Sequence, residues 1–260
     1  MKLQVKNICK TFTNQKQEKT VLDNISFNVE EGQFVTLLGP SGCGKTTMLS
    51  IIAGFEKSDS GVVELDGEVV KGANPDRAFV FQNYALFPWM SVKNNILFPM
   101  KQQKIPKEEE LERLEHLLQI SKLKGHENLY PHQISGGMKQ RTALVRALAG
   151  KPKVLLMDEP LGALDLIMRR SLQTEIENIC LEEKVTAIMV THDVDEAVYL
   201  SDKVILMSTN KGEIVHELMN DLPRPRDRYC EKYKDYCEML IKKISEKGTI
   251  QYNEYSNRLG

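Results

Sequence analysis

The chain lacks a long apolar run, and a helix of its own that crosses a membrane is therefore not expected. A helix that spans a bilayer needs about 20 consecutive apolar residues, whereas the longest uncharged apolar runs here are short segments such as VLLM and AIMV. The N-terminal segment MKLQVKNICK also lacks the apolar core of a signal peptide. We therefore expect the chain to stay in the cytoplasm unless a partner docks it on a membrane.

Paired cysteines and an excess of basic charge are missing as well. The 5 cysteines are scattered and none forms a C-x-x-C pair, so disulfide frameworks and zinc sites are both poorly supported. A formal net charge of −1 gives no general case for nucleic-acid binding. With 41% hydrophobic and 27% charged residues, the composition is that of an ordinary globular protein.

The order of sequence patterns predicts an α/β protein. Alternating segments in the first 70 residues predict strands, with Asp66-Gly67 as a hairpin turn. Leucines at helical spacing in 106–123 predict a helical insertion at about 84–149. Apolar strands and helices then alternate from VLLMD to KVILM, which predicts a parallel sheet covered by helices. We predict one domain over 1–222 and a helical tail in 223–260. The apolar face of this tail is expected to pack on the body, with contact to a partner as the alternative.

The stretch GPSGCGKT predicts a phosphate-binding loop. It matches G-x-x-x-x-G-K-[ST] and stands between an apolar strand and a helical stretch, which is the context that the motif requires. Lys45 is expected to reach the terminal phosphates, and the Thr46 hydroxyl suits Mg²⁺. The residues predicted to bind nucleotide here are Gly39, Pro40, Ser41, Gly42, Cys43, Gly44, Lys45, Thr46 and Thr47.

Polar side chains end three further apolar strands. Asp158 and Glu159 follow VLLM, His192 follows AIMVT, and Gln82 follows RAFVF. Ligands of open α/β sheets bind beyond the carboxyl ends of the strands. We therefore predict that Asp158 holds Mg²⁺, and that Gln82 binds Mg²⁺ or the attacking water. Glu159 is expected to position or deprotonate that water, and His192 to contact the terminal phosphate.

A second pair of glycines raises a separate question. Ser135, Gly136 and Gly137 precede a helical stretch far along the chain from the first loop. Exposed N–H groups at a helix N-terminus bind anions, so this segment is a second candidate phosphate site. Two phosphate sites in one chain suggest a nucleotide held between two copies of the protein.

Taken in order, these motifs resemble those of the ATP-binding cassette (ABC) ATPases. The phosphate loop, Gln82, ISGGM, VLLMDEP, GALD and His192 follow one another as in that family, and the resemblance covers about 3–222. It implies a P-loop NTPase (RecA-like) core with an antiparallel β subdomain and a helical insertion subdomain. Met138 stands where the family usually has glutamine, but the contacts expected from this loop come from backbone and hydroxyl groups.

The resemblance also implies roles for particular residues and a partner. Two copies are expected to pair head to tail as a homodimer, so that Ser135, Gly136 and Gly137 contact the γ-phosphate held by the other copy. Phe12 is where the family stacks an aromatic ring on adenine, Asp165 lies across the dimer interface, and Glu159 is the catalytic base.

The segments SGCGKTT, NYALFPWMSVKNNI and LPRPRDR look like those of nitrate, sulfonate and taurine importer ATPases. That resemblance implies a chain bound at the cytoplasmic face of the membrane to a permease, which works with a solute-binding protein. Trp89, the single tryptophan, is either a core residue or an anchor in the groove that receives a short permease helix; interface energetics favour the anchor.

Three other functions share parts of this sequence pattern. A soluble ABC ATPase acting on DNA or the ribosome usually carries coiled coils or two cassettes, and only 52 residues separate Gln82 from Ser135. A small-molecule kinase shares the phosphate loop but has no need of ISGGM or GALD. A module that binds ATP without hydrolysing it is disfavoured because Glu159 and His192 are both present.

Overall fold

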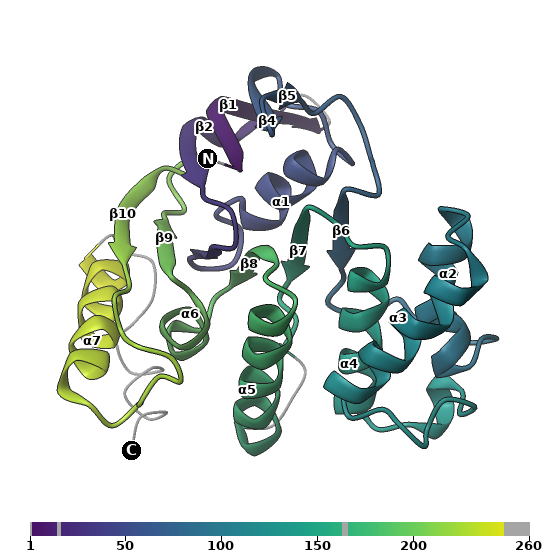
Figure 1. Ribbon diagram of the computed structural model, residues 1–260. Helices are drawn as coiled ribbons and strands as arrows, with labels where there is room; N and C mark the ends of the chain where they lie inside the picture. The colour runs from purple at the N-terminus through teal and green to yellow at the C-terminus, as the bar shows by residue number, and fades with distance from the viewer. Residues whose placement is uncertain (1, 15–16, 163–165, 247–260) are drawn as a thin grey trace. The chain divides into compact units, whose positions relative to one another are not determined.

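The computed structural model describes residues 2–14, 17–162 and 166–246. Within it the chain folds as two compact units (Figure 1). The first unit runs from the N-terminus to Ala73 and resumes at Ile188, and the second unit is Asn74–Ala187. No helix in the described residues has the length and apolar character needed to span a bilayer.

An antiparallel sheet opens the first unit. Its strands, in the order in which they pair, are β2 (Gln17–Val29), β1 (Leu3–Asn14), β4 (Ser60–Leu65) and β5 (Glu68–Val69). Leu3 and Val5 of β1 are buried, whereas Gln4 between them is half-buried, which is the alternation of a strand with one face on the core. The hairpin between β4 and β5 turns at Asp66 and Gly67, as the sequence predicted, and both have positive φ.

The first unit also contains strands of a second sheet and three helices. The strands, in spatial order, are β10 (Ile214–Met219), β9 (Lys203–Met207), β3 (Phe34–Leu38) and β8 (Thr186–Thr191), which enters this unit at Ile188. The helices are α1 (Lys45–Ala53), α6 (Val194–Leu200) and α7 (Glu231–Glu246). Strands β3 and β9 are parallel, and every residue of β3 and β8 is buried. These strands are the core that supports the predicted phosphate loop.

Helix α7 packs on α6 (Figure 1). The Tyr233 hydroxyl donates to Asp195 Oδ1 at 2.7 Å, and the guanidinium groups of Arg226 and Arg224 donate to the Tyr199 and Leu200 carbonyls, each at 2.6 Å. These two carbonyls end α6 and have no partner within the helix, so the tail secures the helix that follows His192.

The second unit combines two parallel strands with a group of helices. Strand β6 (Arg77–Val80) pairs with β7 (Val154–Asp158). The helices are α2 (Val92–Gln102), α3 (Lys107–Ile120), α4 (Gly136–Ala149) and α5 (Leu166–Glu182), with a short 3₁₀ turn at Pro131–Gln133. Helix α4 contacts α2, α3 and α5, so the helix that begins at the second glycine pair is the centre of this unit.

Helix α2 was not predicted from the sequence. It contains Pro99, a residue typical of helix ends. It also depends on a hydrogen bond from a buried side chain, which the spacing of apolar residues in the sequence does not reveal. The buried Asn95 side chain accepts from the Phe87 amide at 2.9 Å and donates to the Met90 carbonyl at 3.0 Å. One side chain of the helix thus fixes the loop that precedes it.

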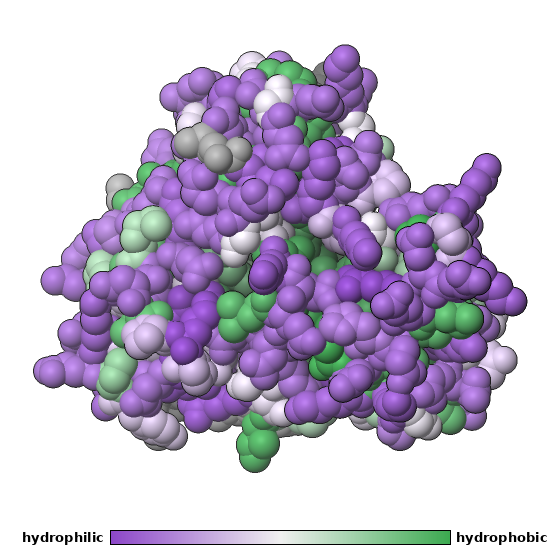
Figure 2. Space-filling model, viewed as in Figure 1, coloured by the Kyte–Doolittle hydropathy of each residue, from purple (hydrophilic) through white to green (hydrophobic). Residues whose placement is uncertain are grey.

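The surface on the face shown in Figure 2 is mostly hydrophilic, and its hydrophobic side chains lie in small separate groups. Single exposed apolar residues are ordinary in folded proteins, so exposure alone assigns no function to them. The described apolar side chains that are more than half exposed are Phe55, Trp89, Ile167, Met219 and Tyr229. Trp89 is 69% exposed, which rules out the interpretation of this residue as part of the core.

A largely buried ion pair connects α3 to the residue that follows α5. The Arg113 guanidinium binds both carboxylate oxygens of Glu183 and donates to the Leu148 carbonyl at 3.0 Å. Burial alone would raise the pKa of the Glu183 carboxyl, but the hydrogen bond and charge of Arg113, aided by His116, outweigh burial, so its pKa lies below the usual value. The ionised carboxylate therefore stabilises the folded unit.

We expect Glu183→Gln to lower the free energy of unfolding by about 2–3 kcal/mol at neutral pH, because it leaves Arg113 buried without its counter-charge. A carboxyl with a lowered folded pKa contributes stability above its unfolded pKa and loses it as the pH falls through the folded pKa. The difference between wild type and variant, measured by urea unfolding, should therefore be complete at pH 7 and shrink below the ordinary value of 4.5.

Glu115→Gln is the matched control, because Glu115 and Lys124 form an exposed ion pair close by. Its loss should cost at most about 1 kcal/mol. A Glu183→Gln effect that is equal at pH 7 and at pH 3 would contradict the ion-pair explanation.

Candidate functional site: two phosphate-binding helix ends

The loop of residues 39–46 connects β3 to α1 and requires glycine for two physical reasons. A Cβ at Gly39 would lie 2.5 Å from the Met207 carbonyl oxygen and 2.9 Å from Cys43 Sγ. Gly42 and Gly44 have φ of 79° and 97°, in the left-handed region that side chains disfavour. The result is a narrow backbone turn that ends at a helix N-terminus, which is an anion-binding geometry.

Lys45 directs its ammonium group back into this loop. Its Nζ donates to the Gly39 carbonyl at 2.7 Å and to the Pro40 carbonyl at 2.9 Å, and the residue is 5% exposed. The positive charge is thus enclosed by the turn itself. A phosphate seated on the turn would offer this ammonium stronger, charged acceptors than the two carbonyls.

The remaining residues of the loop divide into exposed and buried positions. Ser41, Gly42 and Thr46 are exposed, and Thr47 is half-buried. The Cys43 thiol is buried, and burial raises its pKa, so it stays a neutral, packed group. The hydroxyl of Thr46, at the N-terminus of α1, is accessible to a ligand on this side of the loop.

His192 follows β8 and is supported on both sides by backbone contacts. The Gly39 amide donates to the Thr191 carbonyl at 3.4 Å, which joins the start of the phosphate loop to the residue before His192. The Asp193 amide donates to the Thr191 hydroxyl at 3.1 Å, and Asp193 Oδ1 accepts from the Glu196 amide as the cap of α6. The structure therefore brings two of the predicted site segments of the first unit together.

Phe12 lies near the end of β1, opposite Lys19 of β2. Its ring is 42% exposed, as a ring that stacks on a ligand must be.

In the second unit, Gln82 and Glu159 converge on one glycine. A Cβ at Gly162 would lie 3.6 Å from Gln82 Nε2 and 3.7 Å from Glu159 Oε2. Glu159 has φ of 41°, an uncommon conformation for a residue with a side chain, of the kind that clusters at functional sites. Asp158, at the end of β7, is half-buried.

Ser135 and the two glycines after it form the exposed beginning of α4. The Ser135 hydroxyl accepts from the Met138 amide at 3.3 Å and caps the helix. Ser135 is exposed, Gly136 is half-buried and Gly137 is buried, with Met168 and Leu172 of α5 around the position of a Gly137 Cβ. This is the second helix N-terminus with the character of an anion site. Asp165, the other residue predicted for this region, lies outside the described residues.

Among the described residues, no three His, Cys, Asp or Glu side chains gather as a metal site. Mg²⁺ in nucleotide sites is usually held by one or two protein oxygens together with substrate phosphates and water. Thr46 in the first unit, and Gln82 and Asp158 in the second, each carry side-chain oxygen of the kind that Mg²⁺ prefers.

Comparison with known proteins shows the family. The pattern of the ABC transporter family matches residues 22–162. The chain belongs to this family. It is 45% identical to an ABC transporter ATP-binding protein of Methanocaldococcus jannaschii, over 93% of this chain and 90% of that protein. It is 41% identical to the aliphatic sulfonates import ATP-binding protein of Bacillus cereus, over 96% and 99% of the two chains.

Two further relatives extend the comparison. The bicarbonate transport ATP-binding protein of Synechococcus elongatus is 45% identical over 86% of this chain, which corresponds to 34% of that longer protein. A solved ATP-binding cassette, dimeric and bound to ADP and phosphate after hydrolysis, superposes with a TM-score of 0.72 at 31% identity, over 84% and 98% of the two chains. The predicted P-loop fold and ATPase activity are confirmed, and the kinase hypothesis is set aside.

We expect Gly39→Ala to abolish nucleotide binding and to lower the free energy of unfolding by about 1–3 kcal/mol, because the added methyl overlaps the Met207 carbonyl. Isothermal titration with ADP and thermal melts would measure both effects. Gly72→Ala is the matched control, since nothing lies within 4 Å of its Cβ position. Normal ADP binding by Gly39→Ala would contradict the assignment of a tight phosphate turn.

Proposed function

We propose that this chain is the ATP-hydrolysing subunit of an importer that takes up a small anionic solute through a separate membrane permease. The relatives named for import of aliphatic sulfonates and transport of bicarbonate support this class of solute. In this proposal a solute-binding protein delivers the solute, and the chain sits at the cytoplasmic face of the membrane, held by the permease.

One observation carries the proposal: a single chain has two helix N-termini that begin at glycines, one at α1 and one at α4. A triphosphate bound by one chain alone needs only the helix N-terminus of α1, which follows the phosphate loop. The dimeric state of the related solved cassettes supports a homodimer. In such a pair, the loop of one copy and Ser135, Gly136 and Gly137 of the other would bind the same nucleotide, so that ATP itself holds the dimer closed.

Different residues of the chain carry the separate steps of ATP hydrolysis. The α1 amides and Lys45 bind and neutralise the phosphates, which is most of what phosphoryl transfer requires. Glu159 takes the proton of the attacking water, Gln82 orients that water, and His192 donates a hydrogen bond to the γ-phosphate. Thr46, Asp158 and Gln82 would hold Mg²⁺, which supplies further neutralisation of phosphate charge.

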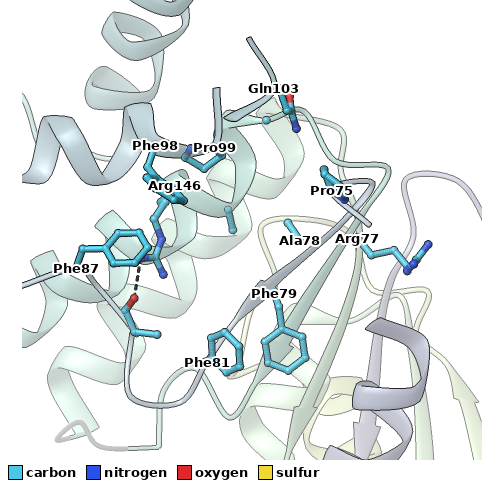
Figure 3. Close-up of a pocket in the computed structure, with 13 residues that line it drawn as sticks. Pro75, Arg77, Ala78, Phe79, Phe81, Phe87, Phe98, Pro99, Gln103 and Arg146 are labelled. Atoms are coloured by element: carbon cyan, nitrogen blue, oxygen red, sulfur yellow. Dashed lines mark hydrogen bonds between the residues drawn. The ribbon is translucent and has the colours of Figure 1, made fainter. Parts of the chain in front are cut away.

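A pocket in the second unit supports the predicted contact with a permease. It has a volume of about 420 Å³ and is lined mainly by aromatic and aliphatic side chains, including Phe79, Phe81 and Phe98 (Figure 3). The Phe87 ring lies 4.7 Å from the Phe98 ring and 5.6 Å from the Trp89 ring, centroid to centroid. An apolar pocket with an exposed tryptophan beside it fits a short helix that carries apolar side chains.

Arg146 connects this pocket to the catalytic segment, and the sequence did not single it out. From α4 its guanidinium donates to the Ala85 carbonyl at 2.7 Å and to the Tyr84 carbonyl at 3.1 Å, and it lies 5.4 Å from the centre of the Phe87 ring (Figure 3). Tyr84 and Ala85 have φ of 63° and 45°, and they follow Gln82 closely in the chain. Movement at the pocket would thus reach both Gln82 and α4 through one side chain.

We expect Glu159→Gln to lower the rate of ATP hydrolysis by at least about 100-fold, the usual effect of removing a general base, while ATP binding is preserved. Size-exclusion chromatography with ATP should then show a stable dimer. Glu238→Gln, on the exposed side of α7, is the control that should leave turnover unchanged. Hydrolysis at the wild-type rate by Glu159→Gln would refute the base assignment.

We expect the chain, purified gently from native membranes, to bring a polytopic permease with it. Trp89→Ala should reduce the permease recovered about tenfold or more, since exposed aromatic anchors contribute strongly to interfaces. Tyr229→Ala is the control, because Tyr229 is an equally prominent exposed ring, 79% exposed, in the other unit. Mass spectrometry that finds only soluble partners would overturn the importer proposal in favour of a soluble ABC ATPase.

A further inference from the structure

Lys10 has an unusual environment for a lysine. It lies on β1 two residues before Phe12, and its side chain is 11% exposed. Its ammonium nitrogen is 5.0 Å from the centre of the Phe12 ring, within the range of a cation–π interaction. One face of the ring is therefore occupied by a positive charge.

Oxygen atoms from one short segment hold this ammonium in place. Lys10 Nζ donates to Glu56 Oε1 at 2.7 Å and to the Lys57 carbonyl at 2.8 Å, and Asp59 Oδ1 is 3.5 Å away. The hydrogen bond with Glu56 is the main cause that raises the pKa of Lys10, so the charge is present at neutral pH. The Thr11 amide also donates to Asp59 Oδ2, at 2.6 Å.

This arrangement joins two parts of the proposed nucleotide site. Glu56, Lys57 and Asp59 follow the C-terminal end of α1, whose N-terminus is the phosphate loop. The same lysine thus contacts the ring and fastens the strand that carries it to the far end of the phosphate-binding helix. The position of the ring relative to the loop is fixed by this tether.

We propose that Lys10 is a positioning residue for the nucleotide base: it holds the Phe12 ring from one side, so that the opposite face receives adenine. The proposal rests on the proposed role of Phe12. A cation draws the π electrons of a ring toward itself, and the opposite face becomes a better partner for an electron-rich purine, because stacked rings otherwise repel through their negative faces.

The test compares ADP with pyrophosphate, which occupies a phosphate loop but has no base to stack. Lys10→Met keeps the length of the stem and removes the charge. Isothermal titration should show ADP binding weakened about threefold to tenfold, the size of one cation–π contact, with pyrophosphate binding unchanged. Lys10→Arg, which keeps the cation, should recover most of the loss.

Lys6→Met is the matched control. Lys6 lies on β1 like Lys10 and forms an ion pair with Glu64 of β4, but among the described residues it makes no cation–π contact. Phe12→Ala should weaken ADP binding at least as much as Lys10→Met, and the double variant should bind no worse than Phe12→Ala alone, because the two residues act together. Equal weakening of ADP and pyrophosphate by Lys10→Met would overturn the proposal.

The outcomes also separate this inference from the function on which it rests. If Phe12→Ala weakens ADP binding and Lys10→Met does not, stacking of the base on Phe12 is supported and the positioning role of Lys10 is refuted. If Phe12→Ala leaves ADP binding unchanged, the stacking role of Phe12 fails, and the inference about Lys10 fails with it.

Discussion

The packing of the first unit around residues 39–46 depends on a backbone turn that leaves no room for a side chain at Gly39 or Gly44. Two neighbouring segments fill the space that side chains would need at Gly39 and Gly44. Met207 at the end of β9 takes the space of a Cβ at Gly39, and Val21 and Leu22 of β2 take that of a Cβ at Gly44. The strands around the loop therefore pack against the bare backbone itself, which keeps the turn tight.

The parts of this protein that were predictable from sequence are those that local pattern encodes. A buried strand, a phosphate loop and a helix follow each other within about 20 residues at 34–53, and their spacing is set by covalent geometry and by glycine. The polar residues that end β7 and β8 were found in the same way, because each follows an uninterrupted apolar run. Such signals do not depend on which distant segment packs beside them.

Other features depend on contacts between distant residues, and no local pattern reports them. Helix α2 contains a proline, and its Asn95 faces the preceding loop and not solvent. Helix α4 includes Gly136 and Gly137, which the sequence placed ahead of the helical stretch, because the Ser135 cap stabilises a turn that two glycines would otherwise disfavour. Arg146 reads as a surface charge in ALVRALAG, although it binds carbonyls 61 and 62 residues earlier in the chain.

The phosphate loop and the segments around Gln82 and Glu159 differ in which residues take positive φ angles, and this difference bears on how an ATPase moves a partner. In the first unit, the positive φ angles of the phosphate loop fall on glycines, and the Lys45 ammonium already has two acceptors. In the second unit, Tyr84, Ala85 and Glu159 carry side chains at positive φ. Such conformations cost about 1–3 kcal/mol each and persist only where the surroundings impose them.

Arg146 is a large part of those surroundings for Tyr84 and Ala85, since it binds both carbonyls. A small displacement of α4 or of the pocket would therefore change the energy of the segment after Gln82. In the loop of residues 39–46 the Lys45 ammonium has two carbonyl acceptors, whereas the segment after Gln82 holds two residues with side chains at positive φ. The strained residues lie close in the chain to Gln82, for which we propose a catalytic role, and Ala85 lines the pocket proposed for the permease, so this segment is where we expect nucleotide binding to be converted into movement of a partner.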